Sequence, residues 1–165
     1  MTTELVAEAI KKAGIAWISV ADGPALGLWV MPLDGALIVV CGPGEQAAPG
    51  LATATRAAMR LRGDNGGLIV IVEALVERLT PGSEAWTEIA PQLANKRLNA
   101  SGTADELVTR WAETDCAIVR LTPTDEPVVA PNLPTDAAAA PPRETPARVE
   151  VRRPIRFHRV RKRKS

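Results

Sequence analysis

The chain has 165 residues, 46% of them hydrophobic, but no Tyr and one Phe, so a single domain with an aliphatic core is expected. No apolar run is long enough to span a bilayer, and residues 1–12 hold two acids where a signal peptide needs an apolar core, which predicts a cytoplasmic protein. The net charge of +1 conceals an asymmetry, because residues 148–165 carry nine Lys or Arg and one acid, a net of +8. The other 147 residues carry 11 bases and 18 acids, a net of −7.

The first quarter of the chain has the pattern of one helix followed by three strands. Val6, Ile10 and Ala13 share one helical face. Thr3 stands in the N-cap position before it. The joints between the strands that follow are short, and Asp34-Gly35 is a favoured hairpin turn, so there is no room for crossover helices. An antiparallel meander is therefore predicted, with strands over residues 15–21, 26–33 and 36–41.

Residues 57–79 have the pattern of a hairpin. Within residues 59–62, Met and Leu alternate with two arginines, which is the period of a strand with one apolar face. Residues 63–67 are rich in Gly and Asn and can reverse the chain. Residues 68–76 are almost wholly apolar, which is typical of a strand inside a covered or closed sheet.

The second half of the chain contains the predicted helices. Residues 42–55 are expected to form a loop with one short helix at most. Ser83 is a candidate cap for a longer helix, which Pro91 is expected to end and restart. Thr103 and Glu106 form the capping box of a further helix.

The last predicted strand covers residues 116–121 and is stopped by Pro123. Residues 124–148 are rich in Pro, Ala, Thr and acids, and such a segment cannot bury enough apolar surface to offset its ordering entropy. A domain over residues 1–124, followed by a disordered linker and basic tail over residues 125–165, is therefore expected. Six mostly antiparallel strands, an N-terminal helix and a helical insertion before the last strand predict a mainly β fold with α, a small closed or half-closed barrel.

This order of elements resembles the split β-barrel superfamily, whose best-known members are the pyridoxamine 5′-phosphate oxidase-like flavin and deazaflavin proteins. The likeness covers about residues 3–123. It implies a homodimer that binds FMN or deazaflavin F420 in a cleft between subunits and transfers hydride to a small substrate. The segments that carry it are residues 16–20, the Trp29 strand with its Asp34-Gly35 turn, and residues 42–46, 60–67, 73–79 and 96–99.

The resemblance also implies that Lys or Arg and hydroxyl side chains after the third strand meet the cofactor phosphate. Here residues 42–46 contain no cation, and Glu45 would repel a phosphate. For two of the substitutes, Arg60 and Arg62, the solvated face of an outer strand is an equal alternative. For Lys96 and Arg97, favourable charge at a helix C-terminus is the commoner reason. The candidate cofactor-binding residues are Thr53, Thr55, Arg56, Arg60, Arg62, Lys96 and Arg97.

Other chemistry is disfavoured by the sequence. Residues 42–47 match the dinucleotide pattern G-x-G-x-x-A, but Pro49-Gly50 would break the helix that this motif requires. The one histidine, His158, lies in the tail, so no histidine-based metal site or catalytic triad is expected in the core. Cys41 and Cys116 are expected to be small buried hydrophobes. The four tryptophans are expected in the core or an interface, with one as a candidate to stack on a flavin ring: Trp17, Trp29, Trp86 and Trp111.

The basic tail has the composition of a segment that binds polyanions by counterion release. Candidate partners are RNA, DNA, an anionic membrane surface or an acidic protein, and the alternative is a solvated tail that touches the acidic body. Two functions follow: a flavin- or deazaflavin-dependent oxidoreductase, or a non-catalytic dimerisation module whose tail contacts nucleic acid. No catalytic acid or base is identified. The candidate polyanion-binding residues are Arg152, Arg153, Arg156, Arg159, Arg161, Lys162, Arg163 and Lys164.

Overall fold

The computed structural model describes residues 4–62, 69–97 and 100–127. The predicted Thr3 cap, the glycine-rich turn at residues 63–67 and the whole basic tail lie outside these residues. The helical elements are α1 (Glu4–Lys11), the 3₁₀ turn η1 (Leu51–Thr53), α2 (Glu84–Lys96) and α3 (Ala104–Glu113). The strands are β1 (Ile15–Ser19), β2 (Leu26–Trp29), β3 (Met31–Leu33), β4 (Ala36–Cys41), β5 (Arg56–Arg62), β6 (Ile69–Leu79) and β7 (Ala117–Pro127).

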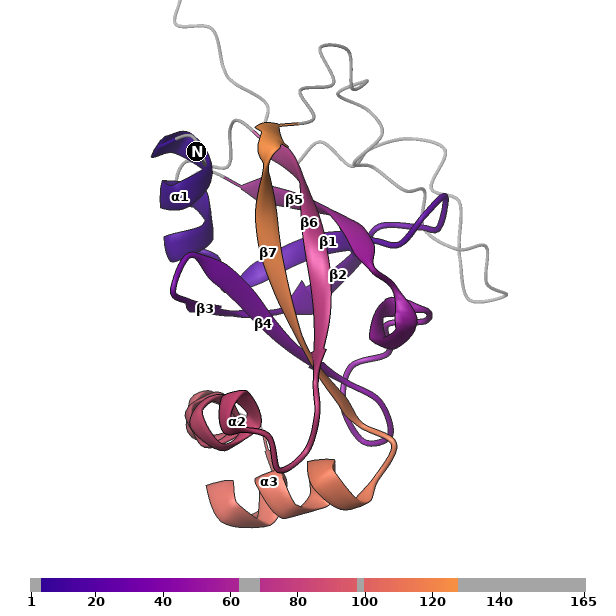
Figure 1. Ribbon diagram of the computed structural model, residues 1–165, viewed down its shortest axis with the longest axis vertical. Coiled ribbons are helices and arrows are strands. Elements are labelled where there is room, and N and C mark those ends of the chain that lie inside the picture. Colours follow the sequence, from indigo (N-terminus) through magenta and orange to yellow (C-terminus); the bar gives the residue numbers. More distant parts are fainter. Residues whose placement is uncertain (1–3, 63–68, 98–99, 128–165) are drawn as a thin grey trace, which may run out of the picture. The chain divides into compact units, whose positions relative to one another are not determined.

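All seven strands form one antiparallel sheet in the order β2-β1-β5-β6-β7-β4-β3 (Figure 1). The sheet curls into a nearly closed barrel, which confirms the predicted mainly β class with an N-terminal helix and a helical insertion before the last strand. The structure has seven strands in the described residues where the sequence predicted six, because the segment expected to form one strand over residues 26–33 forms two.

These two strands, β2 and β3, follow each other directly in the chain but lie at opposite edges of the sheet. β2 pairs with β1, whereas β3 pairs with β4. The joint is Val30, whose backbone N–H leaves the ladder and donates to the Gly14 carbonyl at 3.1 Å. One continuous segment therefore brings the two sheet edges together, which limits the unpaired edge of an open sheet.

The central hairpin forms as predicted. β5 pairs with β6 over seven residues, from Arg56 opposite Leu75 to Arg62 opposite Ile69. The Asp34-Gly35 turn between β3 and β4 is also confirmed, with φ of 48° and 75° at its two residues, the positive values that a type I′ hairpin turn needs.

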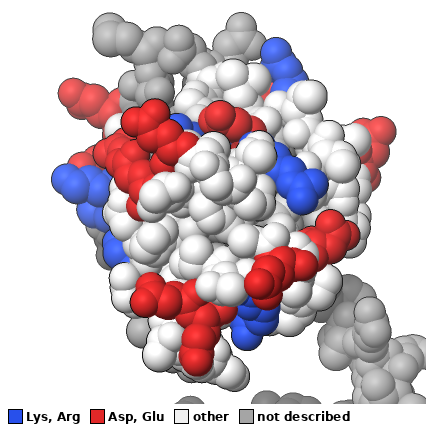
Figure 2. All heavy atoms as spheres, turned by 60° about the horizontal axis from the view of Figure 1, so that its bottom comes forward, with Lys and Arg blue, Asp and Glu red and all other residues white. Residues whose placement is uncertain are grey.

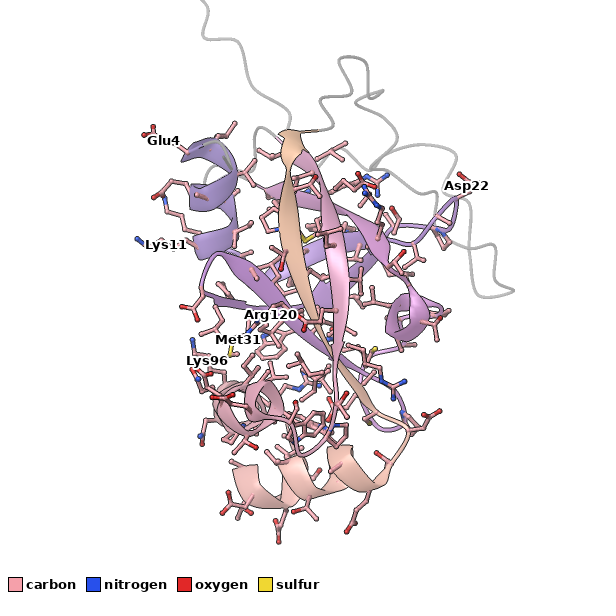
Figure 3. The ribbon with its side chains drawn as sticks, viewed as in Figure 1. Glu4, Lys11, Asp22, Met31, Lys96 and Arg120 are labelled. Carbon is pink, nitrogen blue, oxygen red and sulfur yellow. The ribbon has the colours of Figure 1, made fainter. Side chains whose placement is uncertain are left out.

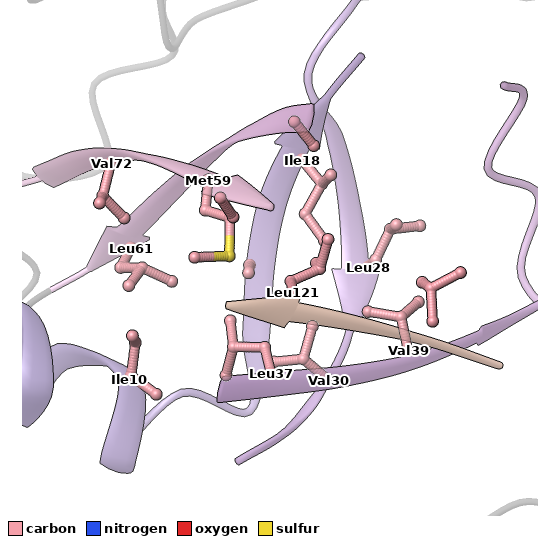
Figure 4. Close-up of a cluster of buried hydrophobic side chains, with 14 of the residues drawn as sticks. Ile10, Ile18, Leu28, Val30, Leu37, Val39, Met59, Leu61, Val72 and Leu121 are labelled. Carbon is pink, nitrogen blue, oxygen red and sulfur yellow. The ribbon is translucent and has the colours of Figure 1, made fainter. Parts of the chain in front are cut away.

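The main core fills the inside of the barrel. Its residues alternate along each strand with outward-facing ones, as in β5, where Met59 and Leu61 are fully buried. α1 packs Val6 and Ile10 against this core, so the amphipathic face predicted for the first helix is confirmed (Figure 4).

A second core lies outside the barrel, between the sheet and the helical insertion. Ile38 and Ile118 on β4 and β7 face outward and pack with Trp86, Leu93 and other buried residues of α2 and α3. The expectation that Pro91 would end and restart a helix is wrong, because α2 runs through it without interruption. A proline inside a helix costs about 3 kcal/mol, and the buried face on both sides of Pro91 offsets that cost.

The last strand is also longer than predicted. β7 continues through Pro123 to Pro127, and Pro123 lies beside the register shift between Val72 and Ala74 of β6. A bulge is a place where a strand tolerates a residue without an N–H. The Thr124 hydroxyl donates to the Glu73 carbonyl there at 3.0 Å, so it satisfies an acceptor beside the break in the ladder.

Candidate functional site

The outer face of β5 carries the three arginines predicted for cofactor binding. Arg56, Arg60 and Arg62 alternate with buried residues and so share one side of the strand. β5 lies between β1 and β6, so these residues do not mark an edge strand. They lie on the outside of the barrel, on a strand that is paired on both sides.

Arg60 is the most enclosed of the three. Its side chain is half-buried, and Nη1 donates to the Ser19 hydroxyl of β1 at 3.1 Å. Ser19, backbone and side chain together, is only 5% exposed. A guanidinium and a hydroxyl that already meet each other form a pair of donors suited to a phosphate oxygen.

Arg62 lies over an aromatic ring. Its guanidinium carbon is 5.2 Å from the centroid of Trp17, which pairs with Arg60 across the β1–β5 ladder. On the other side of Trp17, β2 presents Gly27, and a Cβ there would stand 3.5 Å from Trp17 Nε1. The indole ring therefore lies beside Gly27, at a distance where a Cβ would make an ordinary van der Waals contact.

Arg56 differs from the other two because its charge is neutralised. Its Nη1 lies 2.9 Å from the Glu73 carboxylate of β6. Glu73 stands opposite Ala58, the small residue between Arg56 and Arg60. The uncompensated positive charge of this face is therefore carried by Arg60 and Arg62.

The remaining predicted residues lie elsewhere. Thr53 and Thr55 are exposed before β5, where the Thr53 hydroxyl donates to the Gly50 carbonyl and the Thr55 carbonyl accepts from Val76. Lys96, in the last turn of α2, is exposed and lines a groove beside α1 rather than the arginine face. The structure thus brings Arg60 and Arg62 together with Trp17 and leaves the others apart.

Arg97 belongs to a charge cluster around a buried carboxylate, which the sequence did not predict. The Glu45 side chain is 2% exposed and accepts from Arg97 Nη2, from Arg110 Nη2 at 3.0 Å and from Trp111 Nε1 at 3.0 Å. Glu45 therefore faces the helical insertion and anchors it to the loop after β4. The Arg97 guanidinium carbon also lies 5.1 Å from the centroid of the Trp29 ring, which completes a link from α3 to β2.

The side chain of Gln46, the next residue, forms hydrogen bonds to the backbone of both β2 and β4. Its amide oxygen accepts from the Trp29 N–H, and its Nε2 donates to the carbonyls of Trp29 at 3.0 Å and Val40 at 3.2 Å. Trp29 is the last residue of β2 and Val40 lies near the end of β4, so the Gln46 side chain joins these two strands. No local sequence pattern predicts this role, because Trp29 and Val40 lie 17 and six positions from Gln46.

The other singled-out residues occupy structural positions. Cys41 and Cys116 are buried free thiols, and burial raises the pKa of Cys41, with nearby Cys116 adding to the effect. No helix begins directly after β4, so the dinucleotide motif lacks its required context. Among the described residues there is no cluster of His, Cys, Asp or Glu that could hold a metal.

The charge of the described domain is unevenly spread. Acidic side chains predominate on the face that brings the α2–α3 end forward (Figure 2). None of the described helices is both long and apolar enough to cross a membrane. Exposed acids on and beside the two helices are Glu84, Glu88, Asp105, Glu106, Glu113 and Asp115.

Solved structures resemble this chain although no protein-family model and no curated sequence matches it. The heme storage protein HutZ of Vibrio cholerae superposes with a TM-score of 0.53 at 13% identity, over 76% of this chain and 93% of HutZ. A candidate pyridoxamine 5′-phosphate oxidase of Listeria innocua gives 0.48 at 9% identity over 73% and 92%, and an FAD-binding protein of Mesorhizobium loti gives 0.44 at 17% over 70% and 82%. The described part of the chain has a split β-barrel fold like that of HutZ.

Proposed function

We propose that the chain is a homodimeric split-barrel protein that binds a phosphate-bearing flavin, FMN or deazaflavin F420, on the outer face of β1 and β5. The observation that carries this proposal is the pair Arg60–Ser19 beside the stacked Arg62–Trp17 pair. Arg60 and Ser19 would bind the phosphate, and Trp17 offers an aromatic surface for a planar ring. A bound flavin would supply the hydride chemistry, and the protein would supply position and charge.

The described residues fit a flavin phosphate better than a heme. HutZ is a heme storage protein, and heme iron needs an axial ligand such as His, Cys, Met or Tyr. The sequence has no Tyr, and its one histidine, His158, lies outside the described residues. The described thiols and thioethers are all 4% exposed or less: Met31, Cys41, Met59 and Cys116.

A titration tests the cofactor proposal. FMN and F420 are each added to the full chain while the quenching of cofactor fluorescence is followed, with hemin as a third ligand followed by absorbance. Removing two charge-assisted contacts with Arg60→Ala/Arg62→Ala is expected to weaken flavin binding by about 100-fold. Arg56→Ala is the matched control, because Glu73 already neutralises Arg56, and it is expected to bind flavin like the unaltered chain. Equal binding by the double variant, or no flavin binding at all, would contradict the proposal.

The homodimer is supported by apolar side chains on the same outer face. Ile15 on β1 is 56% exposed and Leu75 on β6 is 49% exposed. Large apolar residues that flank a basic site are expected to be buried by a second copy. Ile15→Glu/Leu75→Glu is expected to convert the dimer to a monomer in light scattering. Leu5→Glu, at a residue of α1 that is 54% exposed, is the control and should leave the mass unchanged.

The second candidate function rests on the tail charge of +8 over residues 148–165. A non-catalytic barrel with this tail would bind nucleic acid with an affinity that falls steeply as salt rises. Deleting residues 143–165 should abolish that binding while leaving any flavin binding intact. If the chain binds nucleic acid only when the tail is present and binds no flavin, this candidate is favoured over the first.

A further inference from the structure

A groove on the described part of the chain lies between the ends of two helices and a hairpin turn. It has a volume of about 530 Å³. Its walls come from the last turn of α1 and the residues after it, from β3 and the Asp34-Gly35 turn, and from Lys96 of α2. Lys11 and Lys96 lie on the same side of the molecule (Figure 3). Three segments that are far apart in the sequence thus form one concave surface.

The charge of this groove is positive. Lys11, Lys12 and Lys96 line it, against the single acid Asp34. Lys12 lies 3.3 Å from Glu8, one turn earlier on α1, so these two charges offset each other. No ion pair joins Lys11 or Lys96 to another described residue. Counting Asp34 against the two remaining lysines leaves a net charge of +1 in the groove.

The rest of the lining is apolar and backbone. Ile10, Pro32 and Leu33 give the groove an apolar wall beside the lysines. Its volume falls in the range of small-molecule sites, about 300–1,000 Å³. A lysine ammonium binds phosphate as a point charge, and an apolar wall suits the organic part of a phosphate ester. We propose that this groove binds a small phosphate monoester, with Lys11 and Lys96 as the cationic anchors.

This site is separate from the one proposed for a flavin. None of the residues on the Arg60 face lines the groove. Arg97 does not line it either, although it follows Lys96 in the chain. The proposal therefore does not depend on the proposed function. It does give Lys96 a role in anion binding at a different place from the one that the family resemblance implied.

One structural reason for lysines in these positions needs no ligand. Carbonyl groups at the C-terminal ends of α1 and α2 attract cations and would hold Lys11 and Lys96 near the groove by themselves. That attraction predicts a loss of stability when the lysines are removed and no saturable binding of a phosphate. Binding and stability must therefore be measured on the same variants.

The test uses the ¹⁵N-labelled full chain, titrated with phenyl phosphate at low ionic strength and followed residue by residue by NMR. Saturable shifts are expected at amides around the groove, such as Lys12 and Gly35, and none with phenol, which lacks the phosphate. Lys11→Gln/Lys96→Gln should weaken the binding at least tenfold, about the value of one charge-assisted hydrogen bond. Both lysines are exposed, and an unchanged unfolding midpoint will show that the double variant is folded.

Arg60→Ala/Arg62→Ala is the control that separates the two sites. It should weaken flavin binding by about 100-fold if the proposed function holds, and it should leave the groove shifts unchanged whether or not that function holds. Three results would overturn the groove proposal. The shifts do not saturate, they are confined to the Arg60 face, or the groove still binds phenyl phosphate when both lysines are replaced.

Discussion

Glu45 and Arg97 form an ion pair across 52 positions of sequence, and the Glu45 side chain in that pair is almost fully buried. Arg110 and Trp111 complete its coordination, and the Nε atoms of both arginines are buried without a partner. One carboxylate therefore compensates two guanidinium groups and joins the loop after β4 to the C-cap of α2 and to α3.

Removing this carboxylate is expected to destabilise the fold strongly. Glu45→Gln leaves Arg97 and Arg110 facing each other without a counter-charge, and the loss of one partner from a buried charge cluster costs about 3 kcal/mol. The measurement is the free energy of unfolding from urea titration. Glu88→Gln, on the exposed surface of α2, is the control and should change it by no more than about 0.5 kcal/mol. A change at Glu45 as small as that at Glu88 would refute the anchoring role.

The free energy of unfolding should depend on the amide donor of Gln46. Glu at this position keeps the acceptor for the Trp29 N–H but replaces the Nε2 donor by an oxygen that faces the carbonyls of Trp29 and Val40. Gln46→Glu is therefore expected to lower the free energy of unfolding by about 2 kcal/mol at pH 7. The loss should shrink at low pH, where the new carboxyl is protonated and regains a donor. A pH-independent loss would contradict this explanation, because Glu and Gln have nearly the same volume and differ in the donor.

Two glycines in the same loop provide a matched pair for backbone crowding. Gly42 has φ of 131°, and a Cβ there would stand 2.8 Å from Cys116 Cα and 2.9 Å from the Asp115 carbonyl oxygen. Gly44 has φ of 75° with nothing within 4 Å. Gly44→Ala should therefore cost only the conformational strain, about 1 kcal/mol, and Gly42→Ala about 3 kcal/mol or more, because backbone atoms must move. Thermal and urea unfolding of both variants measures the difference, and equal losses would contradict it.

The capping box of α3 predicts a pH dependence. The Thr103 N–H donates to the Glu106 carboxylate at 2.7 Å, and this hydrogen bond, followed by that of the Thr103 hydroxyl, holds the pKa of Glu106 below its ordinary value of 4.5. A lowered folded-state pKa means that the stabilisation is present above 4.5 and is lost as pH falls through the folded value. Glu106→Gln should therefore flatten the decline in unfolding midpoint below that pH. An exposed acid on the same helix, in the variant Glu113→Gln, should leave the decline unchanged.

Local sequence determined much of the fold correctly. The Asp34-Gly35 turn, the capping box at Thr103 and the Ser83 cap of α2 each depend on residues within a few positions of one another, so their patterns predict them. The alternation in β5 likewise fixes that Arg60 and Arg62 share a face, because side chains on a strand alternate sides. Periodicity could not show what lies beside that face.

Tertiary structure decided where the elements meet. Residues 26–33 read as one strand, but barrel closure divides them at Val30, because β1 and β4 each need a partner at opposite edges of the sheet. Burial on the second core keeps α2 intact through Pro91, where local propensity alone would break it. From the sequence, Glu45 is expected only to repel a phosphate, yet it binds arginines that lie 52 and 65 positions away. Such contacts depend on the packing of distant segments, and no local pattern encodes them.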